Sequence, residues 1–216
     1  MKKFMVLGSN SFSGSHFCKH LIDEGCEVLA TSRSAEFADV FLPYKWAGIP
    51  NSDLSFVQLD LNKDEHQFSR LISSFRPDYI VNFAAQSMVA ESWDAPSDWV
   101  ETNVGALTRI IESLKKYDGL EKFVHVTTPE VYGSNSNLIS ENHPFNPSTP
   151  YAVTRAAGDM MLQVFHEKYG LPVVFTRAAN VFGPGQQLYR IIPRVIMACM
   201  TGDRFTLDGG GASTRS

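Results

Sequence analysis

The hydrophobic residues of this chain gather in six short runs that are separated by longer segments of helical spacing. Each run is rich in β-branched and aromatic residues and is too short for a helix, which is typical of strands buried inside a sheet. The six predicted strands are Phe4–Leu7, Glu27–Thr31, Ser55–Leu59, Tyr79–Phe83, Lys122–Thr127 and Pro172–Thr176.

Four of the intervening segments repeat apolar residues every three or four positions, which is the period of an amphipathic helix. Strands that alternate with helices predict right-handed crossovers and a parallel sheet with helices on both faces, an α/β doubly wound fold. The apolar faces of the four predicted helices are Phe17, Leu21 and Ile22; Phe68, Leu71 and Ile72; Val104, Leu107, Ile111 and Leu114; and Met161, Leu162, Phe165 and Tyr169.

The composition is typical of a globular protein and excludes two classes of binding partner. With 44% hydrophobic and 19% charged residues, the 216 residues can form one large domain, or one domain and part of another. A formal net charge of -4 offers no basic surface for nucleic acid. No apolar run is long enough to cross a membrane, and three cysteines without CxxC spacing indicate thiols in a reducing compartment. We therefore expect a cytoplasmic protein that binds neither nucleic acid nor membranes.

The chain divides unevenly. Residues 1–180 are expected to form a dinucleotide-binding domain, and residues 181–216 to begin a smaller substrate-binding lobe that is incomplete. The stretch after Asp208 is rich in glycine and has no further element behind it, so we expect residues beyond Ser216.

The first strand is followed by a glycine motif. Gly8, Ser11 and Gly14 recur at intervals of three between this strand and the first helix, the order of elements that forms a dinucleotide pyrophosphate site. Gly8 would make the turn and Gly14 would let the helix pack closely. An ordinary strand–turn–helix joint gives the same pattern when the motif stands alone. Cofactor contacts are expected from Gly8, Asn10, Ser11, Phe12, Ser13 and Gly14.

Residues at the ends of the second and third predicted strands are expected to contact the adenosine part of such a cofactor. Ser32 and Arg33 stand where an acid commonly binds the ribose hydroxyls, and a hydroxyl with a guanidinium would hold a 2′-phosphate instead. This favours NADP over NAD, unless Arg33 is simply a solvated loop residue. Asp60, followed by Leu61, suits a contact with the adenine edge or could cap the next helix.

Small and polar residues follow the fourth and fifth strands. Ala84 and Ala85 leave room for a ligand at the carboxyl edge of the sheet, although small residues also serve tight helix packing. Thr128 and Glu130 stand where catalytic groups project in such folds, and Glu130 could alternatively be an ordinary acid at a helix start.

Tyr151 and Arg155 are four residues apart, which places them on one face of a helix. A tyrosine has a pKa of about 10 in water, so a role as a base near neutrality requires positive charge beside it. Arg155 and an oxidised nicotinamide would supply that charge. A Tyr–Arg pair on the surface is the alternative interpretation.

Taken in order, these motifs resemble the extended short-chain dehydrogenase/reductase family, particularly its nucleotide-sugar 4,6-dehydratases. The resemblance implies a Rossmann fold, NAD or NADP as cofactor, a nucleotide-diphosphate sugar as substrate, and a homodimer formed through helices 104–116 and 151–169. It rests on GSNSFSG from Gly8, DL from Asp60, NFAAQS from Asn82, ETNVGA from Glu101, HVTTPEVYG from His125, NPSTPYAVTR from Asn146 and RAANVFGPGQQ from Arg177.

The resemblance also implies roles for single residues. Tyr151 would take the proton of the sugar C4 hydroxyl, Thr128 would hydrogen-bond the same oxygen, and Glu130 would remove the C5 proton. Water would then leave from C6, and hydride would return there to give a 4-keto-6-deoxy sugar nucleotide. The remaining implied contacts are Ser87 and Asn180 with the sugar or its phosphates, and Ala84, Ala85, Thr102, Thr127, Tyr151 and Arg155 with the cofactor.

Two residues depart from the family pattern. Arg155 replaces the usual lysine, which keeps the charge but cannot readily give up a proton. Pro129 replaces the aspartate that would protonate the departing C6 hydroxyl in many dehydratases. A 4-epimerase, reductase or decarboxylase of the same family, or a catalytically impaired cofactor-binding protein, therefore remain alternatives. No metal is expected, because His16 and His20 have helical spacing but no third ligand.

Overall fold

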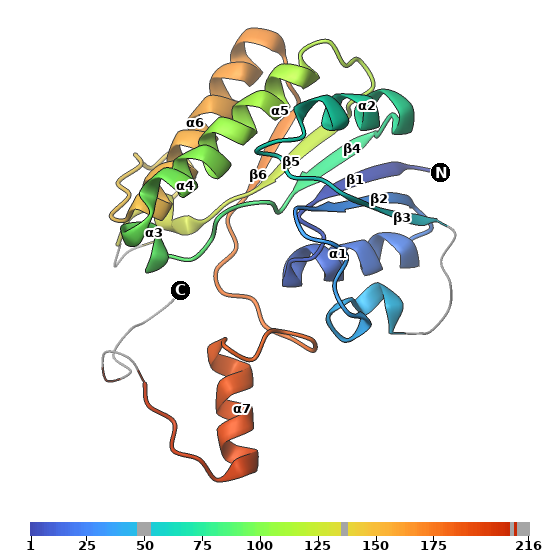
Figure 1. The fold of residues 1–216 in the computed structure, drawn as a ribbon. Helices are drawn as coiled ribbons and strands as arrows, with labels where there is room; N and C mark the ends of the chain where they lie inside the picture. The colour runs from blue at the N-terminus through green and yellow to red at the C-terminus, as the bar shows by residue number, and fades with distance from the viewer. Residues whose placement is uncertain (47–52, 135–137, 208–209, 211–216) are drawn as a thin grey trace.

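The structure is a computed structural model, and it describes residues 1–46, 53–134, 138–207 and 210. Six parallel strands form one sheet in the order β3-β2-β1-β4-β5-β6 (Figure 1). Each predicted strand is present and begins and ends within one residue of its prediction. The strands are β1 (Lys3–Leu7), β2 (Glu27–Ser32), β3 (Leu54–Gln58), β4 (Tyr79–Asn82), β5 (Lys122–Val126) and β6 (Val173–Thr176).

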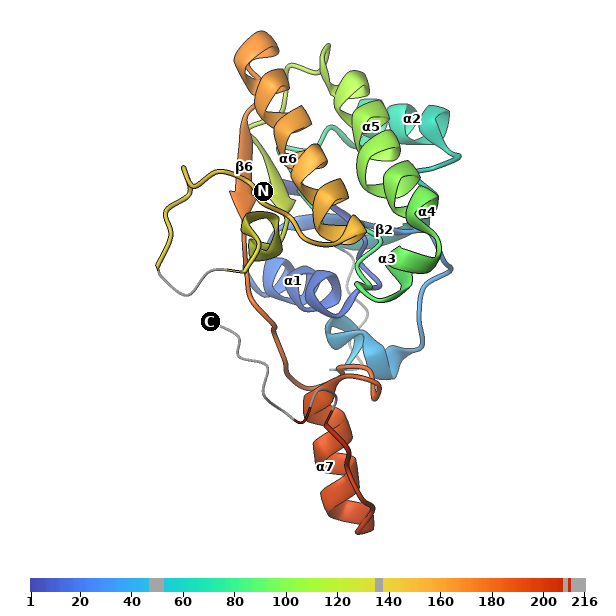
Figure 2. The same cartoon turned by 90° about the vertical axis from the view of Figure 1, so that its left-hand side faces the viewer.

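Helices cover both faces of the sheet, as predicted (Figures 1 and 2). One face carries α1 (Phe12–Asp23), with the 3-10 turns η1 (Asp39–Phe41) and η2 (Pro43–Lys45) beside it. The opposite face carries α2 (Glu65–Phe75), α5 (Leu107–Leu114) and α6 (Pro150–Tyr169). The remaining elements are α3 (Glu91–Asp94), α4 (Pro96–Val100), the π-helical segment η3 (Glu101–Ala106), the 3-10 turn η4 (Pro129–Tyr132) and α7 (Ile191–Thr201).

Strand β1 shows why the strands are hydrophobic throughout. Met5 and Leu7 enter the core beneath α2, α5 and α6, whereas Val6 enters the core beneath α1. Successive side chains of a strand point to opposite faces, and both faces of this sheet are covered by helices. A continuous apolar run is therefore the pattern that a central parallel strand requires.

The predicted apolar face of the 104–116 helix is buried inside the chain. Leu107, Ile111 and Leu114 are all at most 3% exposed and belong to the main core. Their spacing is accounted for by core packing and is not evidence for a partner subunit. Tyr169, predicted on the inner face of its helix, is instead 53% exposed at the end of α6.

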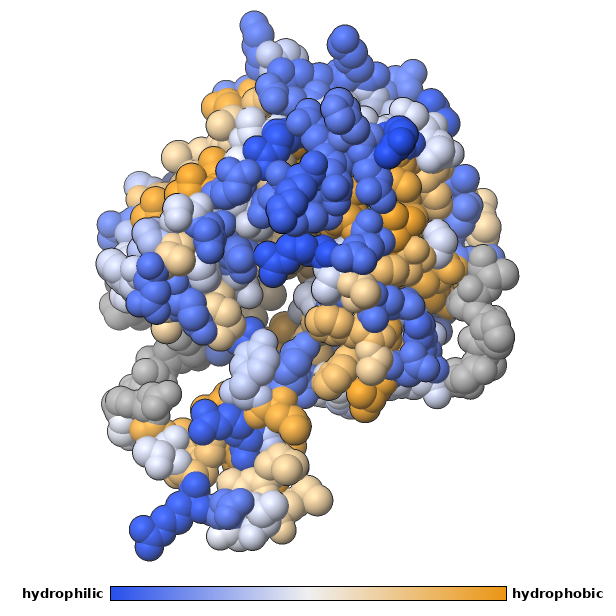
Figure 3. Space-filling view, in the orientation of Figure 1, coloured by the Kyte–Doolittle hydropathy of each residue, from blue (hydrophilic) through white to orange (hydrophobic). Residues whose placement is uncertain are grey.

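The segment after β6 leaves the sheet and passes beside α1 before it reaches α7 (Figure 2). The His16 Nε2 atom lies 3.0 Å from the carbonyl oxygen of Pro184, and a Cβ on Gly185 would lie 2.8 Å from the ring of Trp46. None of the residues of α7 is buried, and its apolar side chains are on the surface in Figure 3. The division at residue 180 stays a prediction.

Part of the predicted glycine-rich end lies outside the described residues. Before α6, residues 138–149 are irregular and largely exposed, and Pro150 begins the helix. Residues 135–137, and the glycine-rich end except Gly210, are not described. In the described part of the chain, no helix has the length and apolar character needed to span a bilayer.

Candidate active site

The glycine loop, residues 8–14, connects β1 to α1 through two positions where no side chain fits. Gly8 has a φ of +81°, and a Cβ there would lie 2.7 Å from the backbone nitrogen of Ala84. A Cβ on Gly14 would lie 2.4 Å from the carbonyl oxygen of Gly8. The turn predicted for Gly8 and the close helix approach predicted for Gly14 are therefore both present.

The same loop presents hydrogen-bond donors at the start of α1. Ser11 is the N-cap: its Oγ accepts from the Gly14 N–H at 3.1 Å and donates to the Gly8 carbonyl at 2.7 Å. The first N–H groups of a helix have no intrahelical partner. Those of Phe12 and Ser13 have none among the described residues and can bind an anion at the positive end of the helix dipole. The loop therefore fits a dinucleotide pyrophosphate.

The segment after β2 is tied to this loop by Asn10. Its buried side chain donates from Nδ2 to the Ser34 hydroxyl at 2.9 Å and to the Ala35 carbonyl at 2.8 Å. The side-chain amide is therefore used within the protein, where it fixes the chain that follows Arg33. Arg33 itself is exposed at the end of β2, next to the half-buried Ser32, and its guanidinium forms no ion pair with any described residue.

Asp60 caps a turn and does not cap a helix. Its Oδ1 accepts from the Asn62 N–H at 3.0 Å, while α2 begins at Glu65 with Asp64 before it. The alternative of a helix N-cap at Asp60 is wrong, because the turn carries the chain four residues further before the helix starts. The side chain of Asn62 in turn donates to the Thr102 hydroxyl at 3.1 Å.

Several predicted residues meet around a small cavity at the carboxyl ends of β4 and β5. Ligands of open parallel sheets bind outside this edge, and the cavity itself has room for only about one water molecule. Leu61, Ala84, Thr102 and Arg155, predicted from four separate motifs, all line it, together with Asn82, Asn103, Leu107, Ile110 and His125.

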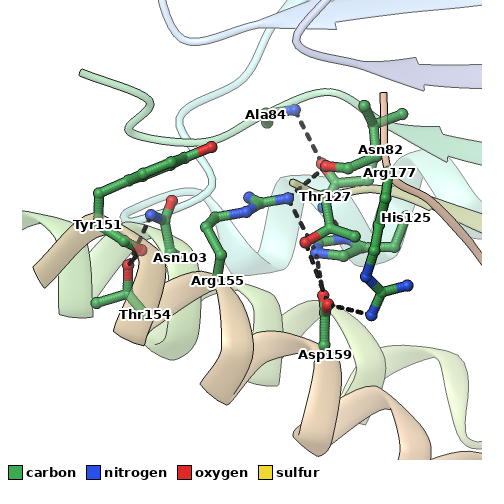
Figure 4. Close-up of polar contacts among 11 residues, drawn as sticks. Asn82, Ala84, Asn103, His125, Thr127, Tyr151, Thr154, Arg155, Asp159 and Arg177 are labelled. Atoms are coloured by element: carbon green, nitrogen blue, oxygen red, sulfur yellow. Dashed lines mark hydrogen bonds and ion pairs between the residues drawn. The ribbon is translucent and has the colours of Figure 1, made fainter. Parts of the chain in front are cut away.

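Asn103 organises one wall of this cavity, and the sequence patterns did not single it out. It is buried in η3, where its Oδ1 accepts from the Gln86 N–H at 2.9 Å and its Nδ2 donates to the Gln86 carbonyl at 3.0 Å. The same Nδ2 donates to the Thr154 hydroxyl on α6 at 3.0 Å (Figure 4). The loop that contains Ala84 and Ala85 is thereby fixed against α6, whereas Ser87 is exposed.

Tyr151 lies in the first turn of α6, whose N-cap is Thr149. Burial raises the pKa of the phenol, while the positive charge of Arg155 and a hydrogen bond with Thr128 lower it. Thr128 is also the N-cap of η4, where its Oγ1 accepts from the Glu130 N–H at 3.2 Å. The negative charge of Glu130 raises the pKa of Tyr151, so the structure brings the predicted acid–base residues together.

A buried charge cluster, formed by His125, Arg155, Asp159 and Arg177, lies behind Tyr151. Arg155 is 3% exposed, and its Nη2 donates to the Val126 carbonyl and lies 3.2 Å from His125 Nε2. Arg155 is therefore not a surface residue, as the alternative interpretation held, but part of the interior.

The carboxylate of the cluster is held by two donors. Asp159 is 1% exposed, and its Oδ2 accepts from Arg177 Nη2 at 2.8 Å and from the Thr127 hydroxyl at 3.2 Å. The Thr127 hydroxyl therefore points into the protein. Asn180, three residues after Arg177, is exposed in an irregular segment. Sequence patterns missed Asp159 and Arg177, since each looks like an ordinary charged residue until α6 and β6 are packed together.

Comparison with known proteins agrees with this architecture. A model of the NAD dependent epimerase/dehydratase family matches residues 4–216. The dTDP-glucose 4,6-dehydratase of Xanthomonas campestris pv. campestris (strain B100) is 30% identical over 226 residues, which cover 100% of this chain and 63% of that protein.

Two solved structures have similar folds. DesIV, a dTDP-glucose 4,6-dehydratase from Streptomyces venezuelae with NAD and TYD bound, has a TM-score of 0.81 at 31% identity, covering 93% of this chain and 62% of that chain. UDP-glucuronic acid 4-epimerase from Bacillus cereus, in complex with UDP-glucuronic acid and NAD, has a TM-score of 0.82 at 26% identity, covering 93% and 64%. The chain spans less than two thirds of the length of these relatives. Since the family model matches almost every residue, the chain belongs to the NAD-dependent epimerase/dehydratase family.

Proposed function

We propose that the protein is a nucleotide-sugar 4,6-dehydratase. The observation that carries the proposal is the meeting of Tyr151, Thr128 and Glu130 at the carboxyl end of β5. The glycine loop lies along the same edge of the sheet, because the carboxyl ends of parallel strands share one edge. A phenol, a hydroxyl and a carboxylate in that position suit proton removal at two neighbouring sugar carbons.

In this proposal the chain's own residues move the protons. Tyr151, as phenolate, accepts the C4 hydroxyl proton while Thr128 donates a hydrogen bond to the same oxygen. A bound nicotinamide supplies the hydride acceptor for C4 and later the hydride donor for C6. Glu130 removes the proton from C5, which the neighbouring ketone has made acidic. Pro129, the first residue of η4, carries no proton, so Glu130 must also return its proton to the departing C6 hydroxyl to form water. The return of hydride to C6 is completed by a proton from solvent at C5, which balances the C4 hydroxyl proton that Tyr151 releases to solvent.

The test uses purified protein with NAD or NADP and each of GDP-mannose, dTDP-glucose, UDP-glucose and CDP-glucose. A dehydratase gives a 4-keto product that absorbs in alkali, and Tyr151→Phe is expected to lower that rate about 1,000-fold, since it removes the general base. Tyr169→Phe, which removes an exposed hydroxyl at the far end of the same helix, is the matched control. Absence of the chromophore with all four sugars contradicts the proposal.

A 4-epimerase is the second candidate, and two observations favour it. The B. cereus epimerase has a similar fold, and Pro129 removes an acid that many dehydratases use. Nuclear magnetic resonance of the product separates the two activities: an epimer retains its C6 hydroxyl, whereas the dehydratase product does not.

We further propose NADP as the preferred cofactor. The exposed guanidinium of Arg33 and the hydroxyl of Ser32 lie at the end of β2, and Asn10 fixes the chain that follows them. Arg33→Ala is expected to weaken NADP binding at least tenfold and to leave NAD binding unchanged, because only NADP carries the 2′-phosphate. Calorimetry with both cofactors measures this; equal losses for both would assign Arg33 no role in selection.

The homodimer, the second lobe and the compartment also belong to the proposal. On α6, Val153, Met160 and Val164 are about half exposed at helical spacing, which supports a subunit contact through this helix. Light scattering of Val164→Glu against wild type tests the dimer. The lobe after residue 180 is supported by α7, none of whose residues is buried, and a reducing cytoplasm by three free cysteines.

A further inference from the structure

Arg155 stands where the family pattern has a lysine, and the structure surrounds its guanidinium with groups that the proposed reaction does not use. Tyr151, Arg155 and Asp159 are spaced by four along α6, so all three face the end of β5 (Figure 4). Gly158 allows the close approach: a Cβ there would lie 3.0 Å from Leu107 Cδ2 and 3.1 Å from the Asn103 carbonyl. The absence of a side chain at residue 158 therefore lets α6 pack closely against η3 and α5.

His125 provides an acceptor for the guanidinium. It is 1% exposed on β5, and its Nε2 lies 3.2 Å from Arg155 Nη2. With Nε2 as the acceptor, the ring proton is on Nδ1, which lies 3.3 Å from the side-chain amide of Asn82. Only a neutral imidazole can accept from a guanidinium. Burial and the charges of Arg155 and Arg177 hold the pKa of His125 well below its usual value, so the imidazole stays neutral.

Asp159 provides the counter-charge. Its Oδ1 has no hydrogen-bond partner in the described part of the chain and lies 3.8 Å from His125 Nε2. Its Oδ2 binds Arg177, whose guanidinium lies about 5 Å from the rings of Tyr132 and Phe175. With His125 neutral, the cluster holds two guanidinium groups and one carboxylate. An uncompensated buried charge is unfavourable, and one negative charge on Tyr151 would balance the surplus.

We propose that His125 and Asp159 are positioning residues for Arg155. The imidazole holds the guanidinium behind Tyr151, and the carboxylate offsets part of the positive charge that acts on Tyr151. The inference rests on the proposed function, since Tyr151 acts as the base there. A guanidinium has five N–H donors and an ammonium has three, so the arginine that distinguishes this chain requires more acceptors here than a lysine would. Glu130 and Thr128 face Tyr151 from η4, and their effects on its ionisation are left unchanged by substitutions at 125 and 159.

The test measures the ionisation of Tyr151 directly and needs no substrate. The near-ultraviolet absorbance of phenolate is titrated in the purified chain, and the same titration of Tyr151→Phe is subtracted. His125→Phe keeps a ring among the aromatic neighbours Phe123 and Phe175 but removes the acceptor. Without this acceptor the guanidinium of Arg155 is no longer held behind Tyr151. The fraction of Tyr151 in the phenolate form at a given pH is then expected to fall about tenfold, which corresponds to one pKa unit.

The second variant predicts the opposite sign. Asp159→Asn leaves two guanidinium groups without a counter-charge, so the phenolate fraction is expected to rise. Arg155→Met is expected to lower the phenolate fraction. Added to His125→Phe, it is expected to lower this fraction no further, because both substitutions remove the same interaction between His125 and Arg155. His125→Gln, which keeps an acceptor, is expected to restore the wild-type titration, and His20→Phe, on the exposed part of α1, to leave it unchanged.

Unchanged titration in both His125→Phe and Asp159→Asn, or additive effects of His125→Phe and Arg155→Met, overturns the inference. If His125→Phe does not fold, the Asp159→Asn and His125→Gln titrations decide. An inactive wild-type chain that shows the expected titrations contradicts the proposed function and leaves this inference standing. An active chain without them does the reverse.

Discussion

The glycine loop at residues 8–14 and the buried charge cluster behind Tyr151 lie along the same edge of the sheet, and they are built in different ways. The loop depends on backbone: Gly8 and Gly14 are required because no Cβ fits, and the free donors are N–H groups of α1. The cluster depends on charged side chains removed from water, such as Asp159 and Arg155. One region is constrained by steric contact, and the other by the balance of buried charge.

This difference decides how each region tolerates change. A site built from backbone groups excludes larger side chains, and its stability does not depend on pH because amides do not titrate. A buried charge site tolerates similar shapes, but it responds to pH and to the loss of any single partner. Four substitutions test the comparison.

The largest loss is expected from Arg177→Gln. It leaves the Asp159 carboxylate buried without its cationic partner, which costs about 4 kcal/mol in the free energy of unfolding. Lys19→Gln, which breaks the exposed pair of Lys19 with Asp23, is the matched control and is expected to change little. Urea unfolding at neutral pH measures both. Equal effects would mean that the buried pair is no more important than a surface one.

Gly8→Ala is expected to cost about 3 kcal/mol, the sum of a left-handed backbone strain and a steric overlap. The overlap is with the backbone of Phe83 and Ala84, which cannot move aside as a side chain can. Gly25→Ala is the control, because Gly25 also has a positive φ but a Cβ there meets nothing within 4 Å. The difference between the two variants gives the overlap alone. If they lose the same stability, the close approach of β1 to β4 is not what requires glycine.

The third prediction compares how the stability contributed by the glycine loop and by the buried charge cluster depends on pH. Burial raises the pKa of Asp159 to about 6 from 3.8, against the lowering effect of Arg177 and Arg155. Because the folded chain binds this proton more tightly, the contribution is fully present below pH 3.8 and is lost as the pH rises through 6. The difference in the free energy of unfolding between wild type and Asp159→Asn is therefore expected to decrease between pH 3.8 and pH 6. Gly8→Ala should show no such slope relative to wild type.

Ser11→Ala should have the smallest effect, about 1 kcal/mol, since it removes the side chain that caps α1. Ser13→Ala, which removes a hydroxyl two residues further along the chain, is the control in the same thermal unfolding experiment. A loss of cofactor affinity that exceeds the loss of stability would show that Ser11 serves the loop's shape as well as the helix. No loss of either would make the cap dispensable.

The site was only partly predictable from the patterns. Tyr151 and Arg155 were paired by their helical spacing, and both face the same edge of the sheet. Asn103 was missed because its hydrogen bonds join Gln86, 17 residues away, to Thr154, 51 residues away. The apolar face of α5 was predicted correctly, but its burial in the core had to be seen, since core packing and a subunit contact produce the same period.

The sequence by itself determined the six strands, their parallel pairing through helical crossovers, and the need for glycine at positions 8 and 14. Those features follow from local periodicity and from backbone sterics, both of which are properties of neighbouring residues. Only the tertiary structure decided where the charge of Arg155 lies, because its acceptor His125 is 30 residues away and its counter-charge Asp159 is bound by Arg177 from beyond β6. Burial and electrostatic balance arise when distant segments exclude water together, and no stretch of sequence carries them alone.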